Sequence, residues 1–301
     1  MRVRILLLLI AVVFFNCRSP GKSAQVTGGA LFNTFMIETN LGRGTTFSID
    51  LDHREYWITA KHMFTGIKTA PAGVFTKKTV QANILSQIGE GDEGHDLHWM
   101  TETFTTIDPG KDIDILVLAP DHLLIPNASG SALKVGADGV SLGGDCEFLG
   151  FPYGDGWKAQ WQDPKDPNKT SWVWLPFIKH CTPSARLQEG GLRIWILDGI
   201  NNEGFSGGPV LVGTGPNQKA FAVISGFHQE PLEVLPAPPA GTKRTSSIPP
   251  PPQLAGENTK VVDQRIVNAN SGFIIAFDID SAIKAIRDNP IGPLRSEDKP
   301  R

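Results

Sequence analysis

The sequence predicts an all-β protein that ends in one short helix. Short runs of β-branched and aromatic residues recur between turn signals along most of the 301 residues, and this spacing is typical of all-β folds. A helical pattern is convincing only at Asp280–Asp288, where an acidic start, apolar Ile283 and Ile286 and a following Pro290 mark one helix. With 40% apolar residues, the chain has the length and composition to bury the core of one sizeable globular unit.

The first residues predict an export signal. Arg2 and Arg4 precede an apolar run over residues 5–15, which is shorter than the roughly 20 residues that a membrane-spanning helix needs. Cys17 follows this run and leaves two alternatives open, ordinary secretion or a lipoprotein leader with a lipid anchor on Cys17. We therefore expect residues 1–25 to be a signal peptide or lipoprotein leader and the protein to be exported (periplasmic, at the cell surface or secreted). An uncleaved N-terminal anchor is the remaining alternative.

The expected strands follow the leader in chain order. Each is a run of β-branched or aromatic residues bounded by turn-forming residues. They cover residues 31–39, 45–51, 56–60, 113–118, 147–151, 192–197, 209–212, 220–226 and 273–277.

Two insertions interrupt this pattern, at residues 154–170 and 231–256. The second contains eight prolines between Pro231 and Pro252, and we do not expect either tract to pair as a central strand. The proline-rich loop is interpreted as an exposed loop without a partner or, alternatively, as a polyproline ligand for a partner protein. Residues 291–301 are expected to form a polar tail.

Export would place the chain where disulfides persist, and Cys146 and Cys181 are then the candidates for a bridge. Both cysteines sit in apolar stretches that could be facing strands of one hairpin. Two buried free thiols explain the same pattern, so the pairing stays open.

Charge does not identify a partner. The formal net charge is −3, so the chain lacks the basic excess that binding to nucleic acid or to an anionic membrane requires. His95 and His98 could suggest a metal pair, but no cysteine or third ligand lies at a useful spacing. The sequence therefore predicts neither a metal site nor an organic cofactor.

The clearest chemical signal is a serine among glycines, Ser206 in the segment Gly204-Phe-Ser-Gly-Gly-Pro209. Glycines let the backbone make a tight turn that exposes Oγ and directs N–H groups inward, so that the amides of Gly204 and Ser206 could stabilise an oxyanion. An ordinary glycine-rich hairpin turn is the competing interpretation. The chemistry favours a nucleophile on a turn.

A serine nucleophile needs a general base, and the base needs a carboxylate. His62 is the best candidate for the base, because it ends the strand-like run over residues 56–62. Asp112 and Asp114 open the next apolar run, and periodicity places both on one face of a strand. We expect Asp112 to be the acid, because the whole apolar run follows it, with Asp114 as the alternative.

These three segments resemble the signature segments of the trypsin-like (chymotrypsin-fold) serine peptidases, in that family's order. They are Thr59-Ala-Lys-His62, Asp112-Ile-Asp-Ile-Leu and Gly204-Phe-Ser-Gly-Gly-Pro209. The resemblance covers roughly residues 28–289. It implies two six-stranded β-barrels packed face to face, within residues 26–290 and with a boundary near residues 120–135. The implied activity is hydrolysis of peptide bonds in a protein or peptide substrate.

The resemblance also implies a substrate-binding edge. Ser225 lies in Ile224-Ser-Gly226, which resembles the strand on which the family pairs the substrate backbone. His228 follows it, and two interpretations stay open: selection of an acidic side chain, or exposure to solvent. No aspartate marks a pocket for a basic side chain.

Three residues depart from the family pattern. Phe205 occupies the position at which the digestive members have an aspartate that pairs with a newly cut N-terminus, so the chain resembles more closely the bacterial branch that needs no such activation. Phe205 must then find a pocket of its own. Lys61 and Asp114 each place a further charge beside the predicted triad, which could detune the site.

Two competing functions are weighed against the peptidase. The serine motif also matches the nucleophile elbow of esterases and lipases, but that fold needs a histidine late in the chain, and the last one here is His228. The second alternative is a weakly active or inactive chymotrypsin-fold protein that serves as a binding or scaffold module. The complete Ser, His and Asp set favours the peptidase.

Overall fold

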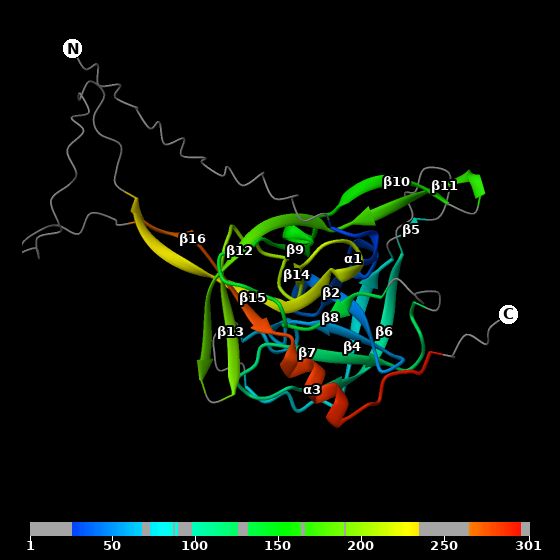
Figure 1. Ribbon diagram of the computed structural model, residues 1–301, viewed down its shortest axis with the longest axis horizontal. Helices are drawn as coiled ribbons and strands as arrows, with labels where there is room; N and C mark the ends of the chain where they lie inside the picture. Colours follow the sequence, from blue (N-terminus) through cyan, green and yellow to red (C-terminus); the bar gives the residue numbers. More distant parts are fainter. Residues whose placement is uncertain are drawn as a thin grey trace, which may run out of the picture.

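The computed structural model describes residues 26–67, 73–86, 88–89, 98–125, 132–163, 166–189, 191–234 and 265–295. The described chain forms two closed antiparallel β-barrels of six strands each, followed by a short C-terminal helix (Figure 1). The predicted fold class, that of the chymotrypsin-like proteins, is confirmed.

The first barrel closes in the order β1-β2-β3-β7-β6-β4, with β4 pairing back to β1. Its interior holds apolar side chains that alternate with outward polar ones, as in β4, where Val80, Ala82 and Ile84 point inward. The strands are β1 (Thr34–Thr39), β2 (Gly42–Leu51), β3 (Arg54–Thr59), β4 (Thr79–Leu85), β6 (Trp99–Ile107) and β7 (Leu116–Pro120).

The second barrel closes because β14 pairs with both β9 and β15. A short strand, β8 (Lys134–Val135), adds to β15 in parallel. The barrel strands are β9 (Cys146–Gly150), β12 (Phe177–Glu189), β13 (Leu192–Asp198), β14 (Pro209–Val212), β15 (Lys219–Val234) and β16 (Arg265–Asp278). The chain thus passes from one barrel to the other between Pro120 and Cys146.

A shared apolar core joins the barrels. Phe47 and Ile49 from the first barrel pack in one cluster with Leu149 and Leu211 from the second. The C-terminal helix α3 (Asp280–Asp288) adds Ile286 to the same cluster. Because burial of this surface requires both barrels, they form one folding unit around the interface.

Short segments flank the barrel strands at both ends of the described range. Residues 31–33, predicted as part of a strand, belong instead to a short helix, α1 (Gly28–Phe32), and its C-cap. Thr27 caps this helix by accepting a hydrogen bond from the N–H of Ala30. After α3, Arg295 forms ion pairs with Asp50 and with buried Glu55, so the segment that follows α3 is tied to the first barrel.

Both insertions contain strands outside the barrels. β10 (Trp157–Asp163) and β11 (Asp166–Leu175) form a hairpin, and Trp172 and Val173 of β11 pair with β5 (Ile88–Gly89), which lies outside both barrels. The far ends of β15 and β16 project on the other side of the molecule (Figure 1). Residues 231–234, assigned to the proline-rich loop, continue β15. This pairing is compatible with Pro231 because the arm is only two strands wide there. The rest of that loop, like Cys17 and the leader, lies outside the described residues.

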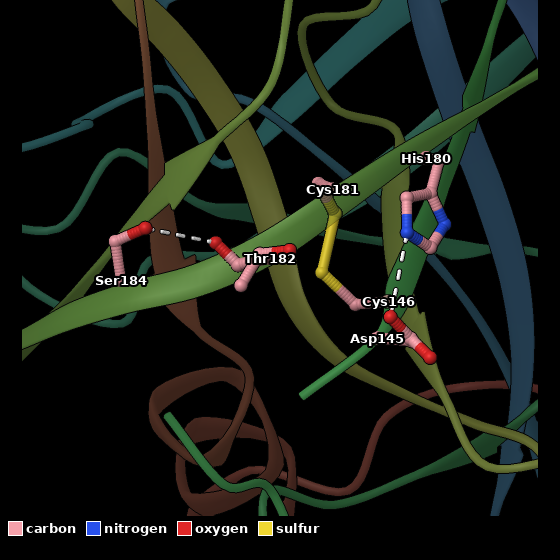
Figure 2. Close-up of a disulfide and its surroundings, with 6 residues drawn as sticks. All are labelled: Asp145, Cys146, His180, Cys181, Thr182 and Ser184. Atoms are coloured by element: carbon pink, nitrogen blue, oxygen red, sulfur yellow. Dashed lines mark hydrogen bonds and ion pairs between the residues drawn. A yellow bond between two sulfur atoms is a disulfide. The ribbon is translucent and has the colours of Figure 1, made fainter. Parts of the chain in front are cut away.

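A disulfide joins Cys146 of β9 to Cys181 of β12, which settles the open pairing (Figure 2). The two residues are direct cross-strand partners, with Cα atoms 5.1 Å apart. On the adjacent positions, the exposed side chains of His180 and Asp145 approach each other to 3.5 Å. The bridge therefore fixes β12 on β9 at the end of their paired stretch.

The remaining helical turns are short. They are α2 (His62–Thr65) and the 3-10 turns η1 (Pro152–Gly154) and η2 (Gly215–Asn217). No helix in the described part of the chain is both long and apolar enough to cross a membrane.

Candidate active site

His62 begins α2 directly after β3, and its imidazole faces Asp114. His62 Nδ1 lies 2.7 Å from Asp114 Oδ2, and the backbone N–H of His62 donates to Asp114 Oδ1 over 2.8 Å. Only 6% of the His62 surface is exposed. Because Nδ1 is engaged by the carboxylate, Nε2 is the nitrogen available to a reactant in the cleft that His62 lines.

The expected acid, Asp112, does not make this contact, and Asp114 takes its place. Strand β7 begins only at Leu116, and residues 110–113 form a turn closed by the N–H of Ile113 and the carbonyl of Gly110. Strand alternation therefore does not apply to Asp112, which lines a separate surface cavity beside α3. Asp114, expected to be an additional charge beside the predicted triad, is the residue that contacts His62.

Ser225 connects the acid to the serine loop. Its hydroxyl donates to Asp114 Oδ2 over 2.5 Å, while its carbonyl accepts a hydrogen bond from Ser206 Oγ at 3.3 Å. The predicted substrate-binding residue thus contacts the carboxylate with its side chain. Ser225 therefore contacts both Asp114 and Ser206, the first through its side chain and the second through its backbone.

The serine lies on a tight turn that requires glycine on both sides. Gly204 has φ +97°, and a Cβ there would lie 2.1 Å from the carbonyl oxygen of Phe151. Gly207 has φ +86°, and a Cβ there would lie 2.1 Å from the carbonyl oxygen of Thr45. Both the left-handed backbone and the close approach exclude a side chain. The glycines are therefore structural requirements of the turn.

Two peptide planes of this turn are held by their carbonyls. The carbonyl of Glu203 accepts from the N–H of Tyr153 at 2.7 Å, and that of Phe205 accepts from the N–H of Gly208 at 2.8 Å. In a trans peptide the N–H points opposite to the C=O, so the N–H groups of Gly204 and Ser206 point away from these partners. Both residues line the cleft. Their role as oxyanion donors stays a prediction.

Thr45 of the first barrel fixes the same turn from the other side. Its hydroxyl donates to the carbonyl of Gly204 over 2.7 Å, and its N–H donates to the carbonyl of Ser206 over 2.9 Å. The sequence analysis missed both Thr45 and Tyr153. No local pattern marks either residue, because their contacts join segments far apart in the chain.

Phe205 occupies a closed pocket. It is 0% exposed, and its ring packs edge to face against Phe148, with centroids 5.0 Å apart. Gly150 leaves the space for this ring, since a Cβ there would lie 2.6 Å from Phe205 Cδ1. The turn is thus anchored by an apolar side chain.

The side chain of Lys61 is buried and bonds to residues outside the candidate site. It is 0% exposed, and its Nζ lies 2.6 Å from Asp108 Oδ1, 2.6 Å from the Gly110 carbonyl and 3.1 Å from the Gly73 carbonyl. These three acceptors match the three N–H donors of the ammonium. Asp108 also accepts from the N–H of Phe75 at 2.7 Å. Lys61 directly precedes His62. Its side chain therefore links the start of α2 to the segment that leads to Asp114.

A cleft of about 590 Å³ collects most of the predicted site residues. Its lining includes His62, Gly204, Ser206, Ser225 and His228. The side chain of His228 is exposed at the cleft. Among the described residues, no group of three His, Cys, Asp or Glu side chains could hold a metal ion.

Comparisons with known proteins found similar solved structures but no sequence relative. No protein-family model matches the chain, and no curated protein matches its sequence. Among solved structures, the HtrA-type protease AlgW with a tripeptide is similar over 86% of this chain and 60% of its own, with TM-score 0.45 and 14% identity. Human heparin binding protein is similar over 91% and 99%, with TM-score 0.43 and 13% identity.

The thermostable serine protease AL20 from an extremophilic microorganism is similar over 66% of this chain and 87% of its own, with TM-score 0.41 and 13% identity. The chain spans less than two thirds of the length of AlgW. Similarity at this level concerns the path of the chain and carries no information on activity.

Proposed function

We propose that the protein is a serine endopeptidase that hydrolyses peptide bonds through an acyl-enzyme. The observation that carries this proposal is the pair formed by His62 Nδ1 and Asp114 Oδ2 at 2.7 Å, in the same cleft as Ser206. A base held in one tautomer by a buried carboxylate, beside a serine on a glycine turn, is the arrangement that acyl transfer requires.

In the proposed reaction, His62 Nε2 takes the proton of Ser206 Oγ as the oxygen attacks the peptide carbonyl. The amides of Gly204 and Ser206 stabilise the oxyanion, and Asp114 stabilises the imidazolium that forms. His62 then protonates the leaving amine. Water repeats the sequence on the acyl-enzyme, so that Ser206 regains its proton and the acid product leaves.

Activation by a newly cut N-terminus is not part of the proposal, which places the chain with the bacterial-type branch. Phe205, at the position of the digestive aspartate, is buried against Phe148. This packing supports a turn that is formed as the chain folds, because an apolar anchor needs no ion pair.

We further propose that the protein is exported. The Cys146–Cys181 disulfide supports this location, because disulfides persist in oxidising compartments and are rare in reducing ones. A lipid anchor at Cys17 and a partner for the proline-rich loop remain proposals from the sequence alone.

The proposed activity is tested with a peptide library and the purified wild type and Ser206→Ala proteins, with products identified by mass spectrometry. Cleavage by the wild type that is lost in the variant supports the endopeptidase. Equal cleavage by both proteins would assign the activity to a contaminant or another residue. An intact library with a folded wild type would favour the binding or scaffold module.

A further inference from the structure

Lys179 of β12 contacts the segment before Ser206, including Asn202, which lines the cleft. Its Nζ donates to the carbonyl of Ile200 over 2.8 Å and to Oδ1 of Asn202, and it lies 5.3 Å from the centroid of the Phe205 ring. Partial burial lowers the pKa of Lys179. All three contacts fall on the segment that leads into Ser206.

The strand that carries Lys179 is joined to β9 by strand pairing and by a disulfide. Lys179 is the direct cross-strand partner of Phe148, the residue whose ring packs on Phe205. Two residues further on, Cys181 is bound to Cys146 by the disulfide (Figure 2). The backbone that carries Lys179 is therefore tied to the strand that supplies Phe148 to the Phe205 pocket.

Asn202 links the Lys179 ammonium to the turn that carries Ser206. Its Nδ2 donates to the hydroxyl of Tyr153 at 3.1 Å, while the backbone N–H of Tyr153 holds the carbonyl of Glu203 at 2.7 Å. The next amide along the chain is that of Gly204. A displaced Asn202 would loosen the Glu203–Gly204 peptide plane, on which the direction of the Gly204 N–H depends.

We propose that Lys179 is a positioning residue whose ammonium fixes the segment Ile200–Phe205, so that the Gly204 amide keeps the direction an oxyanion donor needs. The side chain suits this role because it brings three N–H donors and a charge to two oxygen acceptors and one aromatic face. The catalytic consequence rests on the proposed function, whereas the ordering of the segment does not.

The ordering is tested by hydrogen–deuterium exchange of peptides that span residues 200–207. Lys179→Met keeps most of the apolar stem and removes the ammonium, and we expect exchange in these peptides to accelerate about tenfold. Peptides from residues 220–224 in the barrel core serve as an internal control and should not change. Unchanged exchange at residues 200–207 would overturn the proposal, and so would equal acceleration in both regions, because it reports general destabilisation.

Two further variants sharpen this test. Lys134→Met is the matched control, because Lys134 Nζ also donates to a backbone carbonyl, that of Pro216, on a surface turn of the same barrel. It should leave exchange at residues 200–207 at the wild-type rate. Lys179→Arg restores a cation with N–H donors and should return exchange toward the wild-type rate. No rescue by arginine would contradict a role for the charge.

The catalytic consequence is measured as a split between kcat and KM. Loss of one oxyanion donor typically costs about a hundredfold in kcat, so a loosened donor in Lys179→Met should lower kcat by about tenfold or more, with a smaller change in KM. An unchanged kcat would overturn the positioning role while leaving the peptidase intact. If wild type shows no activity but exchange accelerates in Lys179→Met, the proposed function fails and the ordering role stands.

Discussion

The carboxylate of Asp114 holds His62 at two points, through the ring Nδ1 at 2.7 Å and through the backbone N–H at 2.8 Å. This double contact fixes both the tautomer of the imidazole and the position of the chain that carries it. The same carboxylate accepts from Ser225. Asp114 is therefore the residue through which three segments of the candidate site are aligned.

Replacement of Asp114 by asparagine should nearly abolish activity. The amide favours the wrong tautomer of His62 and does not stabilise the imidazolium, so we expect kcat to fall by roughly three orders of magnitude or more. Asp112→Asn is the matched control, since Asp112 lines a different cavity, and should leave kcat within about twofold. Steady-state kinetics measure kcat for both variants. A larger loss of kcat in Asp112→Asn than in Asp114→Asn would identify Asp112 as the acid.

The buried pair of Lys61 and Asp108 should be a major determinant of stability. Lys61→Met leaves the Asp108 carboxylate, 85% removed from solvent in the folded protein, without its cation, and breaking a buried pair in this way typically costs about 3 kcal/mol. Urea unfolding measures the loss. Lys284→Met, which removes an exposed pair with Asp288 on α3, should cost less than about 0.5 kcal/mol.

A double variant separates the interaction between the two charges from the effect of each substitution on packing. Lys61→Met combined with Asp108→Asn removes both charges. Its loss in free energy of unfolding should therefore be smaller, by at least about 1 kcal/mol, than the sum of the losses in the two single variants. Strict additivity would show that the two charges do not interact in the folded protein.

Glu147 should make stability depend on pH. It lies in β9 with 4% of its surface exposed, and its Oε2 has no hydrogen-bond partner among the described residues. Burial raises the pKa of Glu147 from 4.5 to about 7, against the opposing charge of His180 and with a further rise from Asp145. The folded protein therefore binds more protons than the unfolded chain between these two pH values, and its free energy of unfolding falls as pH rises through this window.

Glu147→Gln removes this penalty. We expect the free energy of unfolding of the variant to equal that of the wild type near pH 4.5. Above pH 7 it should be higher than that of the wild type by about 1–2 kcal/mol. Thermal or urea unfolding at both pH values gives the difference, in which the titration of all other groups cancels. A constant difference across this range would contradict a raised pKa for Glu147.

The sequence predicted elements well where apolar residues are dense. The strand over residues 209–212 and the helix over residues 280–288 have the predicted bounds. β4 and β6 were missed, because their outward faces are polar and the apolar signal is diluted; in β6 only Phe104 and Ile107 are buried. The insertion strands were missed because proline and charged residues dominate those tracts, and their pairing depends on neighbours outside the local pattern.

The candidate site was predictable where a short motif carries the chemistry. His62 and Ser206 stand in such motifs, and the structure brings both to one cleft. Asp112 was preferred as the partner of His62 because the whole apolar run follows it, but residues 110–113 form a turn and Asp114 makes the contact. Thr45, Tyr153 and Lys179 act through contacts between distant segments, and a single sequence carries no signal for such contacts.

The central claim is that Ser206 is an activated nucleophile, and covalent labelling with a fluorophosphonate probe tests it most directly. Wild type and Ser206→Ala are compared by intact mass and peptide mapping, with circular dichroism to show that both are folded. The account predicts one label on wild type, mapped to Ser206 and absent from the variant. A folded wild type without a label, or an equal label on Ser206→Ala, would contradict it.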